Sequence, residues 1–294
     1  MNGKEDASMG EENFLIVGLG LIGGCYAMSL SRQGYRVTAI DCNPDSIAYA
    51  KEKGMIAGGA SSVEDGEEFI RQANRIVFGL YPTGMVEWIE ENQHLFPAGA
   101  ILTDVSGVKR AVIGRVQGIL RPDLEFIGSH PMAGRELSGV QNSDDRIFEN
   151  ANFIVTPTEK NTPEAVAYAE KLGKTLGFGR ISHLSPEEHD RMVGYLSQLT
   201  HAIAVSLMNA NGSPHLAEYT GDSFRDLTRI ARINENLWSE LFFLNRDILV
   251  PEIDSFVAAL ENLREKLVSG DEEGLKSLFV QSTRRRKQFD KKQE

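Results

Sequence analysis

Short apolar runs alternate with longer amphipathic stretches from residue 14 to about residue 182. The runs show little internal alternation of polar and apolar positions, which is typical of strands covered on both faces. They are FLIVGL (14–19), RVTAID (36–41), RIVFGL (75–80), AILTDV (100–105), EFIGS (125–129), NFIVTP (152–157) and GRISHL (179–184). Helical patterns lie between them near residues 22–33, 45–53, 84–92, 108–119 and 163–176. This order predicts an α/β domain over residues 14–184 with a doubly wound, mostly parallel sheet.

The pattern changes after Leu184. SPEE at 185–188 is a capping-box signature, and apolar residues then recur every three or four positions, so one long helix is predicted to about residue 210. Further helical patterns cover roughly 223–232, 234–246, 247–269 and 271–290. Residues 185–294 are therefore predicted to form an all-α domain. Its helices carry more apolar surface than a domain of this size hides, which favours a homodimer through this domain.

Composition and charge exclude several classes of protein. Of 294 residues, 41% are apolar, enough for a sizeable core, and the formal net charge of −11 argues against nucleic acid or an anionic membrane as partner. Two cysteines without metal-ligand spacing fit a reducing cytoplasm, and we expect no metal site. Residues 1–13 are polar and acidic without an apolar segment, and are predicted to be a disordered tail.

A glycine-rich loop follows the first predicted strand and opens the first helix. It reads G-L-G-L-I-G, and Asp41 ends the next strand 23 residues after Gly18. In this context the motif predicts a Rossmann-type dinucleotide site, with the pyrophosphate at the helix N-terminus. A carboxylate at position 41 favours NAD over NADP, because it accepts hydrogen bonds from a ribose 2′-hydroxyl and repels a 2′-phosphate. The alternative for Asp41 is a turn or helix-capping residue. The loop residues assigned to the cofactor are Gly18, Gly20, Leu21, Ile22 and Gly23.

Three later strands end in polar or special residues. In an open α/β sheet, ligands bind outside the carboxyl ends of the strands. Tyr81 and Pro82 follow the third apolar run, Ser106 follows the fourth, and His130 follows the fifth. Histidine suits proton transfer near neutral pH, so His130 is the candidate base, and Ser106 is a candidate for orienting it or the substrate. The alternatives are a histidine satisfied by backbone in a turn, and a serine that caps the helix beginning near Val108. Lys109 is interpreted as a surface residue of the first helical turn.

The predicted helical domain adds a second set of candidates. Ser197 and His201 share a face of the long helix, whereas His189 lies roughly a third of a turn away around the axis. A lone helical histidine is usually structural, which is the alternative for His201. Arg229 can hold a carboxylate in bidentate fashion. Its alternative is an ion pair with Asp226 on the same helix.

These motifs together resemble the prephenate/arogenate dehydrogenase family of tyrosine biosynthesis. The resemblance covers about residues 14–285 and rests on five motifs in a fixed order. They are GLGLIGG with Asp41, TDVSGVK, GSHPMAG followed by E and SG, LSPEEHD with SxxTH, and FRDLTRIA.

The resemblance implies NAD-dependent oxidative decarboxylation of prephenate to 4-hydroxyphenylpyruvate. It implies His130 as the catalytic histidine, Ser106 as the serine that assists it, and His201 as a second active-site histidine. It also implies Arg229 as the anchor for the substrate carboxylate and Glu136 as a gate. The remaining candidates for substrate contact are Ser197 and Arg135. Tyr81, Pro82 and Ser106 are also candidates for contact with the cofactor.

Three other functions remain open. Arogenate dehydrogenase shares the fold and the chemistry, and the sequence does not separate arogenate from prephenate. A β-hydroxyacid dehydrogenase would usually need a lysine on the helical domain, where residues 185–210 offer histidines and no lysine. A noncatalytic NAD sensor would keep the glycine loop without needing His130, Ser106, His201 and Arg229 together.

Overall fold

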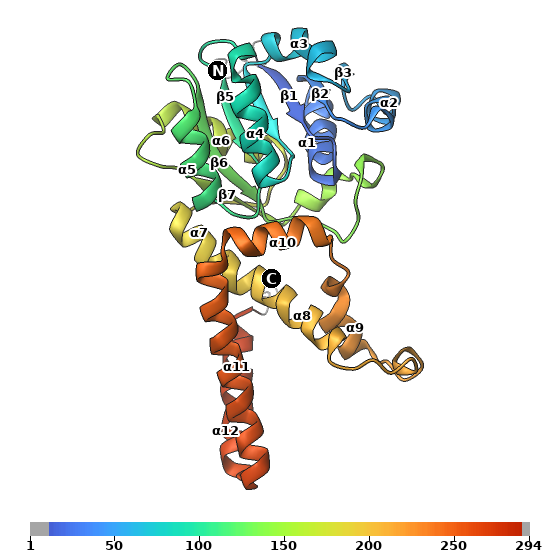
Figure 1. Ribbon diagram of the computed structural model, residues 1–294, viewed down its shortest axis with the longest axis vertical. Helices are drawn as coiled ribbons and strands as arrows, with labels where there is room; N and C mark the ends of the chain where they lie inside the picture. Colours follow the sequence, from blue (N-terminus) through green and yellow to red (C-terminus); the bar gives the residue numbers. More distant parts are fainter. Residues whose placement is uncertain (1–11, 290–294) are drawn as a thin grey trace, which may run out of the picture.

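The computed structural model describes residues 12–289 and contains a twisted sheet flanked by helices, from which a pair of long helices projects (Figure 1). Most of the predicted disordered tail, residues 1–11, lies outside the described residues. Within the described chain the sheet has eight strands in the order β3-β2-β1-β4-β5-β6-β7-β8. All neighbouring strands are parallel except β6 and β7, which run antiparallel. The prediction of a mostly parallel sheet is therefore confirmed.

The strands follow the apolar runs closely. They are β1 (Asn13–Val17), β2 (Arg36–Ile40), β3 (Gly58–Ala60), β4 (Arg75–Phe78), β5 (Ile101–Asp104), β6 (Glu125–Pro131), β7 (Asn152–Thr156) and β8 (Arg180–His183). Successive residues of a strand point to opposite faces, and both faces are buried here. Phe14 and Ile16 face one core, whereas Leu15 and Val17 face the other.

Helices cover both faces of the sheet. The helices of the sheet unit are α1 (Leu21–Arg32), α2 (Pro44–Glu52), α3 (Val63–Gln72), α4 (Pro82–Asn92), α5 (Arg110–Ile119) and α6 (Pro163–Thr175). Buried residues of α1, α2 and α6 belong to one core, and those of α3, α4 and α5 belong to the other. The sheet is therefore doubly wound, as predicted.

The pair β3 and α3 has no counterpart among the predicted elements. The strand has three residues, GGA, and lies at the edge of the sheet beside β2. The helix buries only Gly66 and Ile70, and Ser62 caps its N-terminus. The strand is too short for hydrophobic periodicity to indicate it. The helix has ten residues, one more than the predicted α2, but only Val63, Phe69 and Ile70 among them are apolar.

The helical part begins at the predicted capping box. The Ser185 side chain accepts a hydrogen bond from the backbone N–H of Glu188, whose carboxylate in turn accepts from the backbone N–H of Ser185. The predicted long helix consists of α7 (Pro186–Val193), a π-helical segment (Gly194–Leu199) and α8 (Thr200–Asn209). The remaining helices are α9 (Asp222–Thr228), α10 (Glu235–Leu244), α11 (Arg246–Ser269) and α12 (Glu272–Arg286). The domain boundary at residue 184 stays a prediction. Within residues 12–289 we find no helix with the length and apolar character needed to span a bilayer.

The helical part contacts the sheet unit at one end and projects from it at the other. Leu241 of α10 is buried in the same core as α4 and α5. The helices α11 and α12 pack against each other as an arm that points away from the sheet (Figure 1). Leu249 is the single buried residue that these two helices contribute. Large apolar side chains remain exposed on the arm, namely Val250, Val257, Leu260, Leu267, Val268, Phe279 and Val280.

Candidate active site

The glycine loop forms a close contact between β1, α1 and β4. Gly18 has a φ of +96°, and a Cβ there would lie 2.9 Å from the backbone of Gly79. A Cβ on Gly23 would lie 2.0 Å from the Gly18 carbonyl oxygen, whereas one on Gly20 would meet nothing within 4 Å. No side chain caps the N-terminus of α1. The backbone N–H groups of Leu21 and Ile22 therefore lie at an open, uncapped helix end, which fits a pyrophosphate.

Asp41 braces this loop from the end of β2. Its Oδ2 accepts a 2.6 Å hydrogen bond from the backbone N–H of Leu19, and its Oδ1 accepts a 2.8 Å bond from that of Asn43. Asn43 is the N-cap of α2, so the capping alternative for Asp41 is wrong, although Asp41 does stabilise the turn. Each carboxylate oxygen can accept a second hydrogen bond, so the capacity to bind ribose hydroxyls remains.

The carboxyl end of β4 faces the helical part. Pro82 is buried at the first position of α4, and the preceding Tyr81 accepts a 2.9 Å hydrogen bond on its hydroxyl from Asn234. The backbone N–H of Thr83 donates to Glu240 of α10 at 2.6 Å. Tyr81 and Thr83, on either side of Pro82, thus connect the sheet unit to α10 and its N-cap residue.

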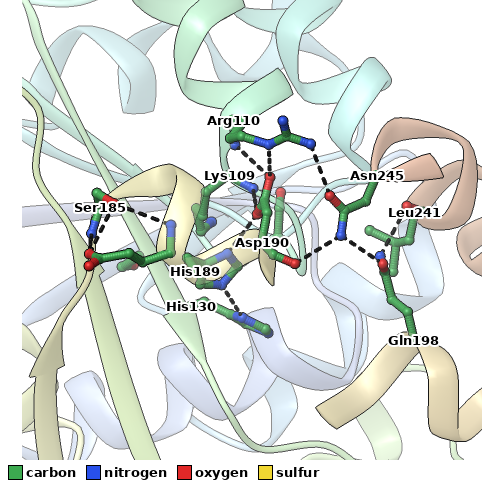
Figure 2. A network of polar contacts seen from close by, with 12 residues as sticks. Lys109, Arg110, His130, Ser185, His189, Asp190, Gln198, Leu241 and Asn245 are labelled. Atoms are coloured by element: carbon green, nitrogen blue, oxygen red, sulfur yellow. Dashed lines mark hydrogen bonds and ion pairs between the residues drawn. The ribbon is translucent and has the colours of Figure 1, made fainter. Parts of the chain in front are cut away.

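His130 lies within β6, paired with Ile154 of β7, and not after the strand as its sequence pattern suggests. Its Nδ1 lies 2.8 Å from Nε2 of His189, and Nδ1 of His189 lies 2.7 Å from Oδ1 of Asp190 (Figure 2). His189 and Asp190 are fully buried on α7. The two imidazoles and the carboxylate therefore form a continuous polar chain from the sheet into the helical part.

Lys109 is the clearest correction to the sequence interpretation. Its side chain is 0% exposed, not a surface residue, and its Nζ lies 2.5 Å from Oδ2 of the equally buried Asp104. Asp104 also accepts hydrogen bonds from the backbone N–H groups of Ser106 and Ser129. This buried ion pair fixes the turn between β5 and α5 beside His130.

Ser106 does not cap a helix. Its hydroxyl oxygen is buried and has no hydrogen-bond partner within residues 12–289. A Cβ on the next residue, Gly107, would lie 4.0 Å from Nε2 of His130. A buried hydroxyl without a partner is costly, so this group is suited to bind a ligand next to His130.

Asp190 connects α7 to the N-terminus of α5. Its Oδ1 accepts a 2.7 Å hydrogen bond from the backbone N–H of Lys109, and its Oδ2 accepts a 3.0 Å bond from that of Arg110. The Arg110 guanidinium also donates to Asn245 and pairs with Asp247. Asn245 in turn donates to the carbonyl oxygen of Asp190 (Figure 2). These contacts fix the helical part on the sheet unit.

The surroundings of His130 and His189 favour the neutral form of both imidazoles. Burial lowers the pKa of His130 well below its ordinary value, and the nearby His189 and Lys109 lower it further. Burial also lowers the pKa of His189, against the opposing effect of its hydrogen bond with Asp190. Burial alone would raise the pKa of Asp190, but hydrogen bonds from His189, Arg110 and Lys109 hold that pKa below its usual value.

A second cluster gathers the helical candidates. Nδ1 of His201 donates a 2.8 Å hydrogen bond to the carbonyl oxygen of Ser197, and its ring stacks on Trp238 with centroids 3.6 Å apart. Arg229 forms an ion pair with Glu136, not with Asp226. Both charges of this pair act on the His201 imidazole, whose pKa is lowered chiefly by burial. His201, Arg229 and Glu136 are therefore neighbours, as a shared site requires.

Arg135 precedes Glu136 in the chain but pairs with a different residue. Its guanidinium is 3.4 Å from Asp144, which also pairs with Arg146. The backbone N–H of Asp144 contacts the sulfur of Cys25 on α1. Arg135 thus belongs to the loop between β6 and β7 that packs on the helix opened by the glycine loop.

The sequence interpretation missed His189, Asp190 and Asn245. The first two stand in the quoted motif LSPEEHD, but their partners are on α5 and β6, far away in the chain. The π-helical segment also breaks the regular α-helical spacing used to relate His189 to His201. The one local signal was the acidic residue directly after a histidine in the first turns of a helix.

Comparisons with known proteins agree along most of the chain. The family model described as prephenate dehydrogenase, nucleotide-binding domain, matches residues 26–181, and the one described as prephenate dehydrogenase, dimerization domain, matches residues 185–281.

Individual relatives are similar over most of their length. The chain is 29% identical to a Bacillus subtilis prephenate dehydrogenase over 92% of this chain and 74% of that protein. It is 27% identical to a Zymomonas mobilis cyclohexadienyl dehydrogenase over 94% of this chain and 95% of that protein. A crystal structure of prephenate dehydrogenase from A. aeolicus, in complex with hydroxyphenyl propionate and NAD+, is 31% identical, with a TM-score of 0.88 over 97% of this chain and 100% of that chain.

We predict that His130 titrates well below the ordinary histidine pKa of about 6.5. Between those two values the unfolded chain binds more protons than the folded chain. The stabilisation from the neutral ring is therefore complete above pH ~6.5 and is lost as the pH falls toward the folded pKa. NMR titration of the His130 ring protons, assigned with a His130→Asn variant, measures the midpoint. A midpoint at or above that of the chain unfolded in urea contradicts the prediction.

Proposed function

Because this chain belongs to the prephenate dehydrogenase family, we propose that it catalyses the NAD-dependent oxidative decarboxylation of prephenate to 4-hydroxyphenylpyruvate. The observation that supports this most is the position of His130. Its Nδ1 is occupied by His189, whereas its Nε2 has no hydrogen bond to any described residue and lies near Gly107, the residue that follows Ser106. A basic nitrogen is thus left free at the carboxyl edge of the sheet, where this fold binds ligands.

NAD, when bound, supplies the acceptor for the hydride that leaves C4 of the substrate ring. His130 takes the proton of the 4-hydroxyl as the hydride departs, and loss of the ring carboxylate as CO2 makes the ring aromatic. The product is a phenol, so the proton held by His130 can return to the product oxygen. Ser106, with its unpaired buried hydroxyl, orients the reacting groups.

The open N-terminus of α1 and the Asp41 carboxylate are the proposed cofactor site. The backbone N–H groups of Leu21 and Ile22 would hold the pyrophosphate, because no side chain caps this helix end. Asp41 would accept hydrogen bonds from the adenosine ribose and repel a 2′-phosphate, which favours NAD over NADP.

Arg229 and His201 are the proposed contacts for the side-chain end of the substrate. The Arg229 guanidinium is 65% exposed and already pairs with one carboxylate, that of Glu136. An exposed ion pair of this kind contributes little stability, so a substrate carboxylate can replace Glu136 at small cost. Glu136 then acts as a gate on the β6–β7 loop.

Arogenate is the second candidate substrate. It carries an amine where prephenate carries a keto group. We retain it as a candidate because one relative is named a cyclohexadienyl dehydrogenase. The proposed proton transfer is the same for either compound, so His130 does not discriminate between them.

The exposed arm supports a homodimer. The helices α11 and α12 leave seven large apolar side chains exposed, and the family model that covers them describes a dimerization domain. A second copy of the chain would bury this surface.

The proposed reaction is tested by NADH formation with prephenate, arogenate and a 3-hydroxy acid in turn. We expect turnover with prephenate, and a loss of about 100- to 10,000-fold in kcat for His130→Ala, because a general base is removed. The affinity for NAD should be unchanged in the His130→Ala variant. His94→Ala is the control, because His94 is exposed and lies outside the candidate site. Turnover of the hydroxy acid alone, or near-normal kcat in His130→Ala, would refute the proposal.

Replacing Arg229 by alanine should raise the KM for prephenate by about 10- to 100-fold, because a charge-assisted bidentate contact is lost. Arg225→Ala is a matched control, since that side chain lies one turn earlier and pairs with Asp222 at the surface. Steady-state kinetics at saturating NAD measure both. Equal KM values for Arg229→Ala and the unmodified enzyme would mean that Arg229 does not hold the substrate.

The unmodified protein should have twice the 32.5 kDa mass of one chain in solution. The double variant Val257→Glu, Leu260→Glu should shift it toward monomer, because charges on the arm oppose burial. Asn262→Glu is exposed on the same helix about half a turn away and should stay dimeric. Light scattering after gel filtration measures the mass, and a monomeric unmodified protein at assay concentration rules the dimer out.

A further inference from the structure

We propose that His189 and Asp190 are positioning residues that hold His130 in the tautomer with its proton on Nδ1, which leaves the Nε2 lone pair free to accept the substrate proton. This inference rests on the proposed role of His130 as the base. It assigns a role in orienting the base to two buried residues whose side chains hydrogen-bond to His130, Lys109 and Arg110.

In the hydrogen-bonded series His130–His189–Asp190, the Asp190 carboxylate can only accept hydrogen bonds. Oδ1 accepts from the backbone N–H of Lys109 at 2.7 Å, and Oδ2 accepts from that of Arg110 at 3.0 Å. The Arg110 Nε lies 3.4 Å from the same oxygen. A carboxylate surrounded by donors stays ionised and has no proton to give. The 2.7 Å contact between Oδ1 and Nδ1 of His189 therefore requires the proton on that nitrogen.

The proton on His189 then determines the tautomer of His130. A neutral imidazole has one N–H, so Nε2 of His189 carries a lone pair and must accept. Its partner at 2.8 Å is Nδ1 of His130, which must donate. Nε2 of His130 is then unprotonated, and it faces the position where a Cβ on Gly107 would be. Without the hydrogen bonds to His189 and Asp190, His130 could equally carry its proton on Nε2, the nitrogen proposed to accept the substrate proton.

A doubly protonated His189 would reverse this assignment. In that case Nε2 of His189 would donate, and His130 would keep its proton on Nε2. Burial has the largest effect on the pKa of His189 and opposes its charged form, and the Lys109 ammonium opposes it further. The carboxylates of Asp190 and Asp104 favour the charged form, but the pKa of His189 still lies below its ordinary value. The neutral form of His189 is therefore favoured.

Buried amides hold Asp190 in place. Nδ2 of Asn245 donates to the carbonyl oxygen of Asp190 at 3.0 Å and to Oε1 of Gln198 at 2.8 Å (Figure 2). Nε2 of Gln198 donates to the carbonyl oxygen of Leu241. The orientation of the proposed base is thus set by contacts among α5, α7, the π-helical segment and α10, and not by β6 alone.

The tautomers can be measured directly in the unmodified protein. In 15N-histidine-labelled protein near pH 7.5, long-range 1H–15N correlation spectra show which ring nitrogen of each of the six histidines is protonated. His130→Asn and His189→Asn variants assign the two rings. We expect the proton on Nδ1 in both rings. A proton on Nε2 of His130, or two protons on His189, overturns the inference. No substrate is needed, so this result is independent of whether prephenate is the substrate.

Asp190→Asn tests the residue at the start of the hydrogen-bonded series Asp190–His189–His130. An amide cannot accept from all the donors around Asp190, so we expect the His130 proton to move, at least in part, to Nε2. In that variant kcat should fall about 100-fold with KM for prephenate within about 3-fold. Asp247→Asn, which removes another carboxylate from the same Arg110, should leave the tautomers and kcat unchanged. An unchanged tautomer together with normal kcat in Asp190→Asn overturns the inference.

A pair of substitutions at His189 separates positioning from packing. Glutamine can place its carbonyl oxygen near the Nε2 position and accept from His130, whereas leucine of similar size cannot. We expect His189→Gln to keep the His130 proton on Nδ1 and to lose less than about 10-fold in kcat, and His189→Leu to lose about 100-fold. Equal activity of the two variants, with equal thermal stability, shows that His189 only fills space.

Discussion

The buried carboxylate of Asp190 constrains the arrangement of the whole site. A carboxylate removed from solvent is strongly unfavourable unless donors surround it. The donors of Asp190 come from the first turn of α5 and from the adjacent His189 ring, and the partial positive charge of the helix end favours an anion there. The placement of the helical part on the sheet satisfies all of them. The proposed base, on β6, is therefore oriented by a charge that belongs to α7.

Three cations in and around the site are each held by carboxylates. Asp104 holds the buried Lys109, Asp190 and Asp247 hold Arg110, and Glu136 holds Arg229. A chain with a net charge of −11 thus still holds positive groups at defined places. The degree of burial separates their roles. The Lys109 pair is fully buried and fixes the turn after β5, whereas the Arg229 pair is exposed and can exchange its carboxylate for that of a ligand.

The sheet could be predicted because its strands are apolar on both faces and its helices have regular spacing. The capping box at Ser185 was readable for the same reason, since its two partners are three residues apart. Lys109 was misplaced because the first turn of a helix is usually exposed, and only a buried Asp104 makes the opposite arrangement possible. His189 and Asp190 bind residues 59 and 81 positions away, so no local pattern indicates them. The roles of His130, Ser106, His201 and Arg229 stay predictions that the geometry supports.

The two clusters of the site differ in how firmly they are built. His189, Asp190 and Lys109 are fully buried, so the groups proposed for proton transfer have little freedom. In contrast, α9 and the turn that carries Arg229 contribute no buried residue, and Glu136 lies on an exposed loop. Segments with few buried contacts open at low free energy. Prephenate and arogenate differ only at the side-chain end of the molecule, which the looser cluster would hold. Substitutions around Arg229 and Glu136 can therefore change the preference between the two substrates, while the buried His189 and Asp190 stay the same.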